Sequence, residues 1–288
     1  SSVITFIDMR QMMWYSDVVS SSEREAAYLI DGLMHNDVIK SDIHSTDTHG
    51  YSEVIFTVLY LLGFIFAPRI KGLGRQKLYA FAHQKMTEKA EQQGFKPHKN
   101  INELLIETEW DEILRFVATI KLKVTTASQL FRRLNSYSKQ HPLYKALKEF
   151  GKIIKKLFIL QYCDDVEFRQ AIEKQLNKVE NSNKLAKAIS LGNDHAFLQG
   201  DKEGQNIAEG CRRLIKNALM CWNSLYLSKV LEDEKDETKK REIVESIEKD
   251  SLMRWAHFNL GGEYDFSSEK MTDSVGLKVP KNKLMPDD

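Results

Sequence analysis

Two acidic residues stand where carboxylates could bind a metal ion, and the first is Asp47. Asp47 follows a run of β-type residues over 38–44. It precedes Gly50 and an apolar segment, predicted to be a helix, over residues 52–62. An acidic side chain at the carboxyl end of a strand projects into open space, where α/β proteins bind ligands. A plainer interpretation stays open, in which Asp47 turns the chain or caps the next helix.

The second acidic residue is Glu180, in a segment whose polar residues recur at spacings of three and four. On a helix they form one stripe opposite Leu176 and Val179, and a simple solvated face is the alternative. Oxygen ligands suit Mg²⁺, and paired carboxylates suit displacement reactions at phosphorus. The separation 180 − 47 = 133 residues leaves room for a helical insertion. The stripe consists of Glu173, Asn177, Glu180, Asn181 and Lys184.

Positive charge is concentrated in the middle of the chain. Residues 115–160 hold eleven Lys or Arg and one acid, Glu149, so 11 − 1 = +10, whereas the whole chain is +1. A basic stripe of this kind is typical of a surface that binds a phosphate backbone. The alternative is a solvated face matched by the acidic residues of 232–250. The residues predicted to bind DNA are Arg132, Arg133, Lys145, Lys148, Lys152, Lys155 and Lys156.

Composition restricts the class of protein. With 29% charged and 42% hydrophobic residues in 288, the chain is expected to fold rather than to be disordered. Three cysteines, Cys163, Cys211 and Cys221, have no metal-type spacing, and their odd number favours reduced thiols in a cytosolic setting. We expect Cys211 and Cys221 to be core residues of one helix. The longest apolar run, residues 54–67, is too short to span a bilayer, so no membrane partner is expected.

The order of predicted elements indicates an α/β core followed by helices. Strands are expected at 3–7, 12–19, up to Asp47 and at 64–67, with helices beginning at a capping box over 22–25 and covering 52–62. This order predicts a mixed sheet. Residues 71–100 are expected to be a connection without regular structure, and residues 102–160 to be helical throughout.

The C-terminal part is predicted to be helical. A helix is expected over residues 166–191, and residues 232–250 read as a charged helix or linker, before a polar tail after 266. Residues 205–231 form a strongly amphipathic pattern, whose apolar side we expect to face the core. That side consists of Ile207, Cys211, Leu214, Ala218, Trp222 and Leu225.

Several of these segments resemble the catalytic region of the Tn-three family of transposases, which are DDE-type enzymes of replicative DNA transposition. Residues 42–56 and 61–70 contain the family's "TDT.G" motif, whose Asp is the second of three metal-binding carboxylates and corresponds to Asp47. Residues 176–188 resemble "LNKGEARNALARA", whose Glu is the third and corresponds to Glu180, although Val179 replaces the family's Gly. Residues 221–227 and 255–264 resemble "LWNTVYL" and "WEHINLTGDY".

The resemblance implies an RNase H-like α/β fold, with a mixed sheet, a large all-helical insertion and a helical C-terminal part. The catalytic core would comprise residues 1–70 and 161–231, the insertion with its basic stripe 85–160, and a charged helix and polar tail 232–288. Asp47 and Glu180 would bind Mg²⁺ or Mn²⁺. The function implied is cleavage of transposon-end DNA and transfer of its 3′-hydroxyl to target DNA by a protein that is homo-oligomeric at full length.

The family's first carboxylate, in an "SSDGQ"-like strand, has no counterpart here. Aligned on residues 31–33, the chain is expected to start after that strand, and Asp8 and Asp17 lack the right flanking residues. We therefore expect an N-terminally truncated piece with two of three metal ligands, inactive by itself. Two alternatives stay open: a non-catalytic remnant that binds DNA or a partner, and an unrelated helical scaffold with surface carboxylates.

Overall fold

The computed structural model describes residues 2–8, 12–19, 25–35, 43–46, 52–82, 99–136, 141–190, 200–249, 252–258 and 262. The chain forms two units. The first comprises residues 1–8 and 14–177, and the second comprises residues 9–13 and 178–288. Each unit is described by itself below.

The first unit begins with a pair of strands and a helix. β1 (Ser2–Ile7) pairs with β2 (Met13–Val19), and α1 (Glu25–Met34) follows. These bounds confirm the two predicted strands, while residues 22–24 of the predicted capping box lie outside the described residues. A Cβ on Gly32 of α1 would overlap the ring of Phe6, so the glycine allows α1 to lie close against β1.

A strand–helix–strand unit comes next. β3 (Ile43–His44) and β4 (Ile65–Phe66) are parallel neighbours joined by α2 (Glu53–Leu62). Ser52 is at the N-cap of α2, and Gly63 ends the helix in a left-handed conformation with φ 94°. The Phe64 N–H then donates to the Leu59 carbonyl at 2.9 Å, which satisfies the helix end. The predicted helix and the strand after it are confirmed; of the β-type run over residues 38–44, only residues 43–44 are described, and they form β3.

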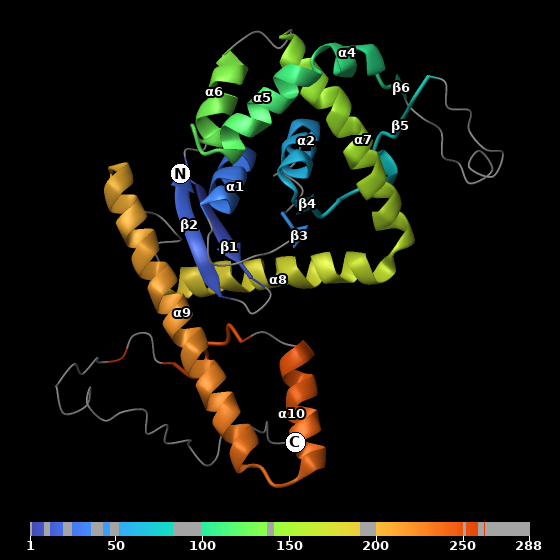
Figure 1. Ribbon diagram of the computed structural model, residues 1–288. Helices are drawn as coiled ribbons and strands as arrows, with labels where there is room; N and C mark the ends of the chain where they lie inside the picture. Colours follow the sequence, from blue (N-terminus) through green and yellow to red (C-terminus); the bar gives the residue numbers. More distant parts are fainter. Residues whose placement is uncertain are drawn as a thin grey trace. The chain divides into compact units, whose positions relative to one another are not determined.

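Helices dominate the rest of the first unit (Figure 1). A 3₁₀ turn, η1 (Leu73–Arg75), precedes a parallel pair of two-residue strands, β5 (Tyr79–Ala80) and β6 (Lys99–Asn100), in a region predicted to lack regular structure. The helices predicted over 102–160 are confirmed. They are α4 (Glu103–Thr108), α5 (Trp110–Lys121), α6 (Ala127–Ser136) and α7 (Pro142–Asp164).

The core of the first unit is centred on the contact between α2 and α7, which lie side by side in Figure 1. The Thr57 hydroxyl, fully buried, donates to the Leu147 carbonyl at 2.5 Å. A Cβ on Gly151 would overlap the Glu53 carbonyl, so the two backbones approach each other where a side chain cannot fit. Apolar side chains of α5 and α6 join this core, so the helices after residue 102 pack with the strand–helix–strand unit.

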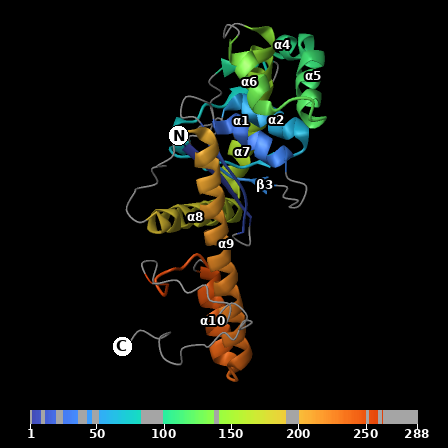
Figure 2. The same cartoon turned by 90° about the vertical axis from the view of Figure 1, so that its left-hand side faces the viewer.

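α8 (Val166–Ile189) begins in the first unit and continues into the second. In the second unit, α9 (Lys202–Asp233) starts where the Asp201 carboxylate accepts the Gly204 N–H at 2.6 Å, and α10 (Glu237–Lys249) follows. Both views show α9 as one unbroken helix (Figure 2). Within the described residues, no helix is long and apolar enough to cross a membrane.

Two expectations need correction. In the described part of the chain, the strands form three separate pairs instead of one mixed sheet. The fold is therefore mostly helical, with three small pairs of strands. The orientation predicted for α9 is also wrong. Its apolar residues Ile207, Leu214 and Leu225 are 62%, 70% and 46% exposed, and both cysteines of this helix are exposed. The opposite face is the buried one, and it carries Glu209, Lys216, Leu219, Met220 and Asn223.

Candidate metal and nucleic-acid site

The carboxyl end of the β3–β4 pair is where the predicted metal site begins. The pairing continues beyond the strands, because the Ala67 N–H donates to the His44 carbonyl and the Arg69 N–H donates to the Thr46 carbonyl, both at 2.8 Å. Asp47 itself lies outside the described residues. In the sequence it directly follows Thr46, the last residue of this ladder that the structure describes.

Helix α8 is attached to this same end of the ladder within the first unit. The Arg69 guanidinium donates to the Glu173 carboxylate at 3.1 Å. Two residues further along α8, the Gln175 side chain donates to the Ile7 carbonyl of β1 at 2.8 Å. An ion pair and a hydrogen bond therefore fix the first half of α8 against the strands.

Glu180 is exposed on α8, as the predicted polar stripe requires. It comes seven residues after Glu173, which is about two helical turns, so the two carboxylates lie on one face of the helix. On the predicted opposite side, Leu176 is buried and Val179 is half-buried. The described residues contain no group of three His, Cys, Asp or Glu side chains arranged to hold a metal ion, and Asp47 is not among them.

The basic residues of α6 and α7 fall into two groups. Lys152 pairs with Glu149 and lies 4.8 Å from the centre of the Tyr79 ring. Lys155 Nζ lies 3.2 Å from Glu53 Oε1, and both lysine side chains are only 12% exposed. Arg132, Arg133, Lys145 and Lys148 are exposed, and Lys156 is half-buried. The structure therefore divides the predicted stripe into two internally paired lysines and a more exposed remainder.

The family of the chain follows from its similarity to known proteins. The model of the Tn3 transposase DDE domain matches residues 1–264. The chain belongs to this family. The matched residues include both Asp47 and Glu180, so both belong to a DDE transposase domain.

Two relatives with similar sequences are larger transposases. The transposase for transposon Tn1546 of Enterococcus faecium is 33% identical over 282 residues, which is 98% of this chain and 28% of that protein. The transposase for transposon Tn2501 of Escherichia coli is 34% identical over 265 residues, 91% of this chain and 26% of that protein. The chain therefore spans little more than a quarter of the length of these relatives.

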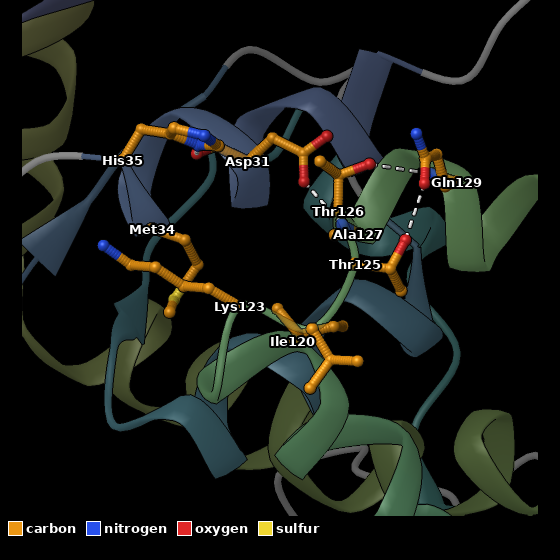
Figure 3. A pocket seen from close by; sticks show the side chains of 10 residues that line it. Asp31, Met34, His35, Ile120, Lys123, Thr125, Thr126, Ala127 and Gln129 are labelled. Atoms are coloured by element: carbon orange, nitrogen blue, oxygen red, sulfur yellow. Dashed lines mark hydrogen bonds between the residues drawn. The ribbon is translucent and has the colours of Figure 1, made fainter.

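In this transposase domain, Asp31 has a structural role at the start of α6 (Figure 3). Its carboxylate accepts the Ala127 N–H at 2.5 Å and the Ser128 N–H at 3.1 Å. An acid at a helix N-terminus satisfies unpaired donors and stabilises the positive end of the helix. The pocket beside it, about 250 Å³, is lined by Met34, Ile120 and other residues of this junction. Sequence reasoning used Asp31 only as an alignment marker and missed this contact.

A second feature that sequence reasoning missed is a set of polar contacts between α8 and α9, in the second unit of the domain. Ser182 of α8 is fully buried, and the Lys216 ammonium of α9 donates to its hydroxyl at 3.4 Å. The ammonium also lies 3.8 Å from Glu209 Oε1. Burial lowers the pKa of Lys216, although Glu209 acts in the opposite direction. These groups connect α9 to the half of α8 that carries Glu180.

His257 of the "WEHINLTGDY"-like segment packs against α9. Its ring stacks on Trp222 at 5.4 Å, and its Nε2 lies 2.8 Å from the Asn223 side-chain oxygen. The Asn223 amide in turn donates to the Leu252 and Arg254 carbonyls at 2.6 and 2.9 Å. The segment after α10 is thereby attached to α9.

The ion pair between Glu53 and Lys155 gives a stability prediction. Burial alone would raise the pKa of Glu53, but Lys155, a backbone hydrogen bond and Lys148 outweigh it and hold the pKa below the ordinary value of a glutamate. A lowered carboxyl pKa contributes stability above the unfolded-state value, and this contribution is lost as pH falls through the folded-state value. Glu53→Gln should lower the free energy of unfolding at pH 7 by about 2 kcal/mol, because it leaves a mostly buried ammonium without its carboxylate.

Urea unfolding at pH 7 and at pH 3.5 measures this effect. The difference between Glu53→Gln and the unmodified chain should shrink at the lower pH. Glu112→Gln is the matched control, because the pair of Glu112 with Arg115 is solvent-exposed and should contribute less than about 1 kcal/mol. Equal effects of the two substitutions would contradict the assignment of Lys155 to an internal pair.

Proposed function

We propose that this chain is the catalytic region of a transposase that cleaves transposon-end DNA and transfers the 3′-hydroxyl to target DNA. The observation that carries the proposal is the parallel pairing of β3 and β4, which extends to Thr46, the residue before Asp47 in the sequence, in a chain of the DDE family. Ligands bind at such strand ends. The proposed fold is RNase H-like around this strand–helix–strand unit.

The donor chemistry fits Mg²⁺ or Mn²⁺. Asp47 and Glu180 offer carboxylate oxygens, which hard divalent cations prefer, and Glu180 is exposed on α8. When bound, a pair of such ions activates the attacking oxygen and stabilises the leaving oxygen in displacement at phosphorus. The residues of this chain have the task of holding the ions. Asp47 would do so from the position after Thr46, and Glu180 would do so from α8, which Arg69 contacts at Glu173 and Lys216 contacts at Ser182.

DNA is the proposed partner, and the exposed basic residues of α6 and α7 are its proposed contacts. Because the side chains of Lys152 and Lys155 are only 12% exposed, we assign the main contacts to the exposed residues Arg132, Arg133, Lys145 and Lys148. Exposed cations release counterions from DNA when they bind, which makes the affinity depend on salt. A remnant that binds DNA without catalysis is the second candidate, since these basic residues are not the ones proposed to bind metal.

A salt titration of DNA binding tests this surface. The double variant Lys145→Glu/Lys148→Glu should bind duplex DNA at least about 10-fold more weakly and reduce the slope of log K against log salt by about 2. The matched control is Lys202→Glu/Lys229→Glu, which reverses two exposed lysines of α9 and should leave both values unchanged. An unchanged slope in the first variant, or the same loss in both, would remove the proposed surface.

Metal-dependent chemistry separates the two candidate functions. Strand joining measured with Mn²⁺, a pre-cut transposon-end oligonucleotide and target DNA would support the catalytic proposal if it required both Asp47 and Glu180. DNA binding that neither Mn²⁺ nor these two carboxylates affect, without any joining, would leave only the remnant.

A further inference from the structure

The exposed face of α9 carries apolar residues at regular intervals, which a helix that only faces water does not require. Six apolar or small residues follow one another at intervals of 4, 3, 4, 3 and 4, and all six are exposed. The buried face of the same helix carries Glu209, Lys216 and Asn223 instead. We call the six residues the α9 seam: Ile207, Cys211, Leu214, Ala218, Cys221 and Leu225.

An average spacing of 3.5 residues is the spacing of core positions in a coiled coil. The α9 seam covers 225 − 207 = 18 steps, which is about 27 Å of helix. Leu214 is 70% exposed and Ile207 is 62% exposed, so the helix presents large apolar side chains to water along this length. A contiguous exposed apolar strip of this kind is typical of an interaction surface.

We propose that the α9 seam docks against the α9 seam of a second copy of this chain, in antiparallel orientation. The seam is self-complementary about Lys216, because the numbers of facing residues add up to 432 in each pair, as a two-fold axis requires. Residues of similar size meet at the ends, two sulfur atoms meet next, and a large residue meets a small one at the centre. The facing pairs are Ile207 with Leu225, Cys211 with Cys221, and Leu214 with Ala218.

Packing favours the antiparallel arrangement over the parallel one. Parallel helices in register would place Ala218 against Ala218 and leave a gap, while Leu214 would meet Leu214 in the next layer. In the antiparallel arrangement each Ala218 receives a Leu214, so large and small side chains alternate and fill the interface. Beside the seam, the exposed Ile215 would meet its own equivalent near the axis, and Asp201 at one end would approach Lys229 of the second copy.

Single-cysteine proteins test the orientation. In a Cys163→Ser background, one protein keeps only Cys211 (Cys221→Ser) and another keeps only Cys221 (Cys211→Ser). With copper–phenanthroline as oxidant, a mixture of the two should give a disulfide-linked dimer, whereas neither protein alone should. Two copies of Cys211 would be ten residues apart along the pair, about 15 Å, and a disulfide needs Cα atoms within about 7 Å. Dimers of either protein alone, or no dimer in the mixture, would overturn the proposal.

Matched leucine variants test the surface itself. Leu214→Glu introduces a charge at the centre of the seam and should reduce the dimer yield of the mixture at least 10-fold. Leu122→Glu changes a leucine of similar exposure, 74%, in the loop after α5, and should leave the yield unchanged. Sedimentation equilibrium without oxidant should show the same contrast, with circular dichroism confirming that both variants fold. Equal yields from the two variants would exclude the seam. This inference stands whether or not the chain binds metal or DNA.

Discussion

Gly151→Ala is expected to lower the free energy of unfolding by at least about 3 kcal/mol. The added methyl group would overlap the Glu53 carbonyl, which is backbone and cannot move away as a side-chain end could. α2 and α7 would have to separate, and overpacking of this kind costs about 1–3 kcal/mol before any hydrogen bond is lost. The bond from Thr57 to the Leu147 carbonyl, one turn away, would be stretched as well.

The control for this variant is Gly210→Ala in α9. Gly210 is also a helical glycine, but an added Cβ there meets no atom of the structure within 4 Å. Alanine is the better helix former by about 1 kcal/mol, so this variant should be neutral or slightly more stable. Urea unfolding of both variants gives the comparison. If Gly151→Ala were as stable as Gly210→Ala, the close crossing of α2 and α7 would be wrong.

Asp47→Asn and Glu180→Gln are each expected to weaken Mn²⁺ binding at least about 10-fold. Each substitution removes one ionised ligand while keeping the size of the side chain, and even changes outside the ligand set commonly weaken metal sites by 10- to 100-fold. Isothermal titration calorimetry of the folded chain measures the affinity. Glu167→Gln, another exposed glutamate of α8, should leave binding unchanged. Equal binding by all three variants would remove the metal proposal.

Local signals explain why the unit around Asp47 could be predicted. Ser52 begins α2, Gly63 ends it in a left-handed conformation, and the apolar runs on both sides have strand composition. These determinants lie within a few residues of one another. β5 and β6, by contrast, are two-residue strands that pair across about twenty residues, and their sequence has no strand pattern.

Tertiary pairing explains what the sequence could not show. The partner of Lys155 is Glu53, 102 residues away, so a lysine that reads as part of a DNA stripe turns inward. On α9, the charge of Lys216 is offset by Glu209, and its ammonium also donates to the Ser182 hydroxyl. Because these polar groups have partners, the polar face of α9 can be buried while the apolar face is exposed. Periodicity identifies the two faces of a helix, but it does not determine which one is covered.

The central claim is that Asp47 and Glu180 hold the same divalent cation. The most direct test is a Mn²⁺ titration in which electron paramagnetic resonance measures the bound ion. It is carried out on the unmodified chain, the two single variants and the double variant Asp47→Asn/Glu180→Gln. A shared site predicts that each single variant loses the same bound Mn²⁺ as the double variant, with no remaining fraction. Single variants that each keep part of the bound Mn²⁺, with losses that add up in the double variant, would mean two separate sites and would contradict the proposed catalytic centre.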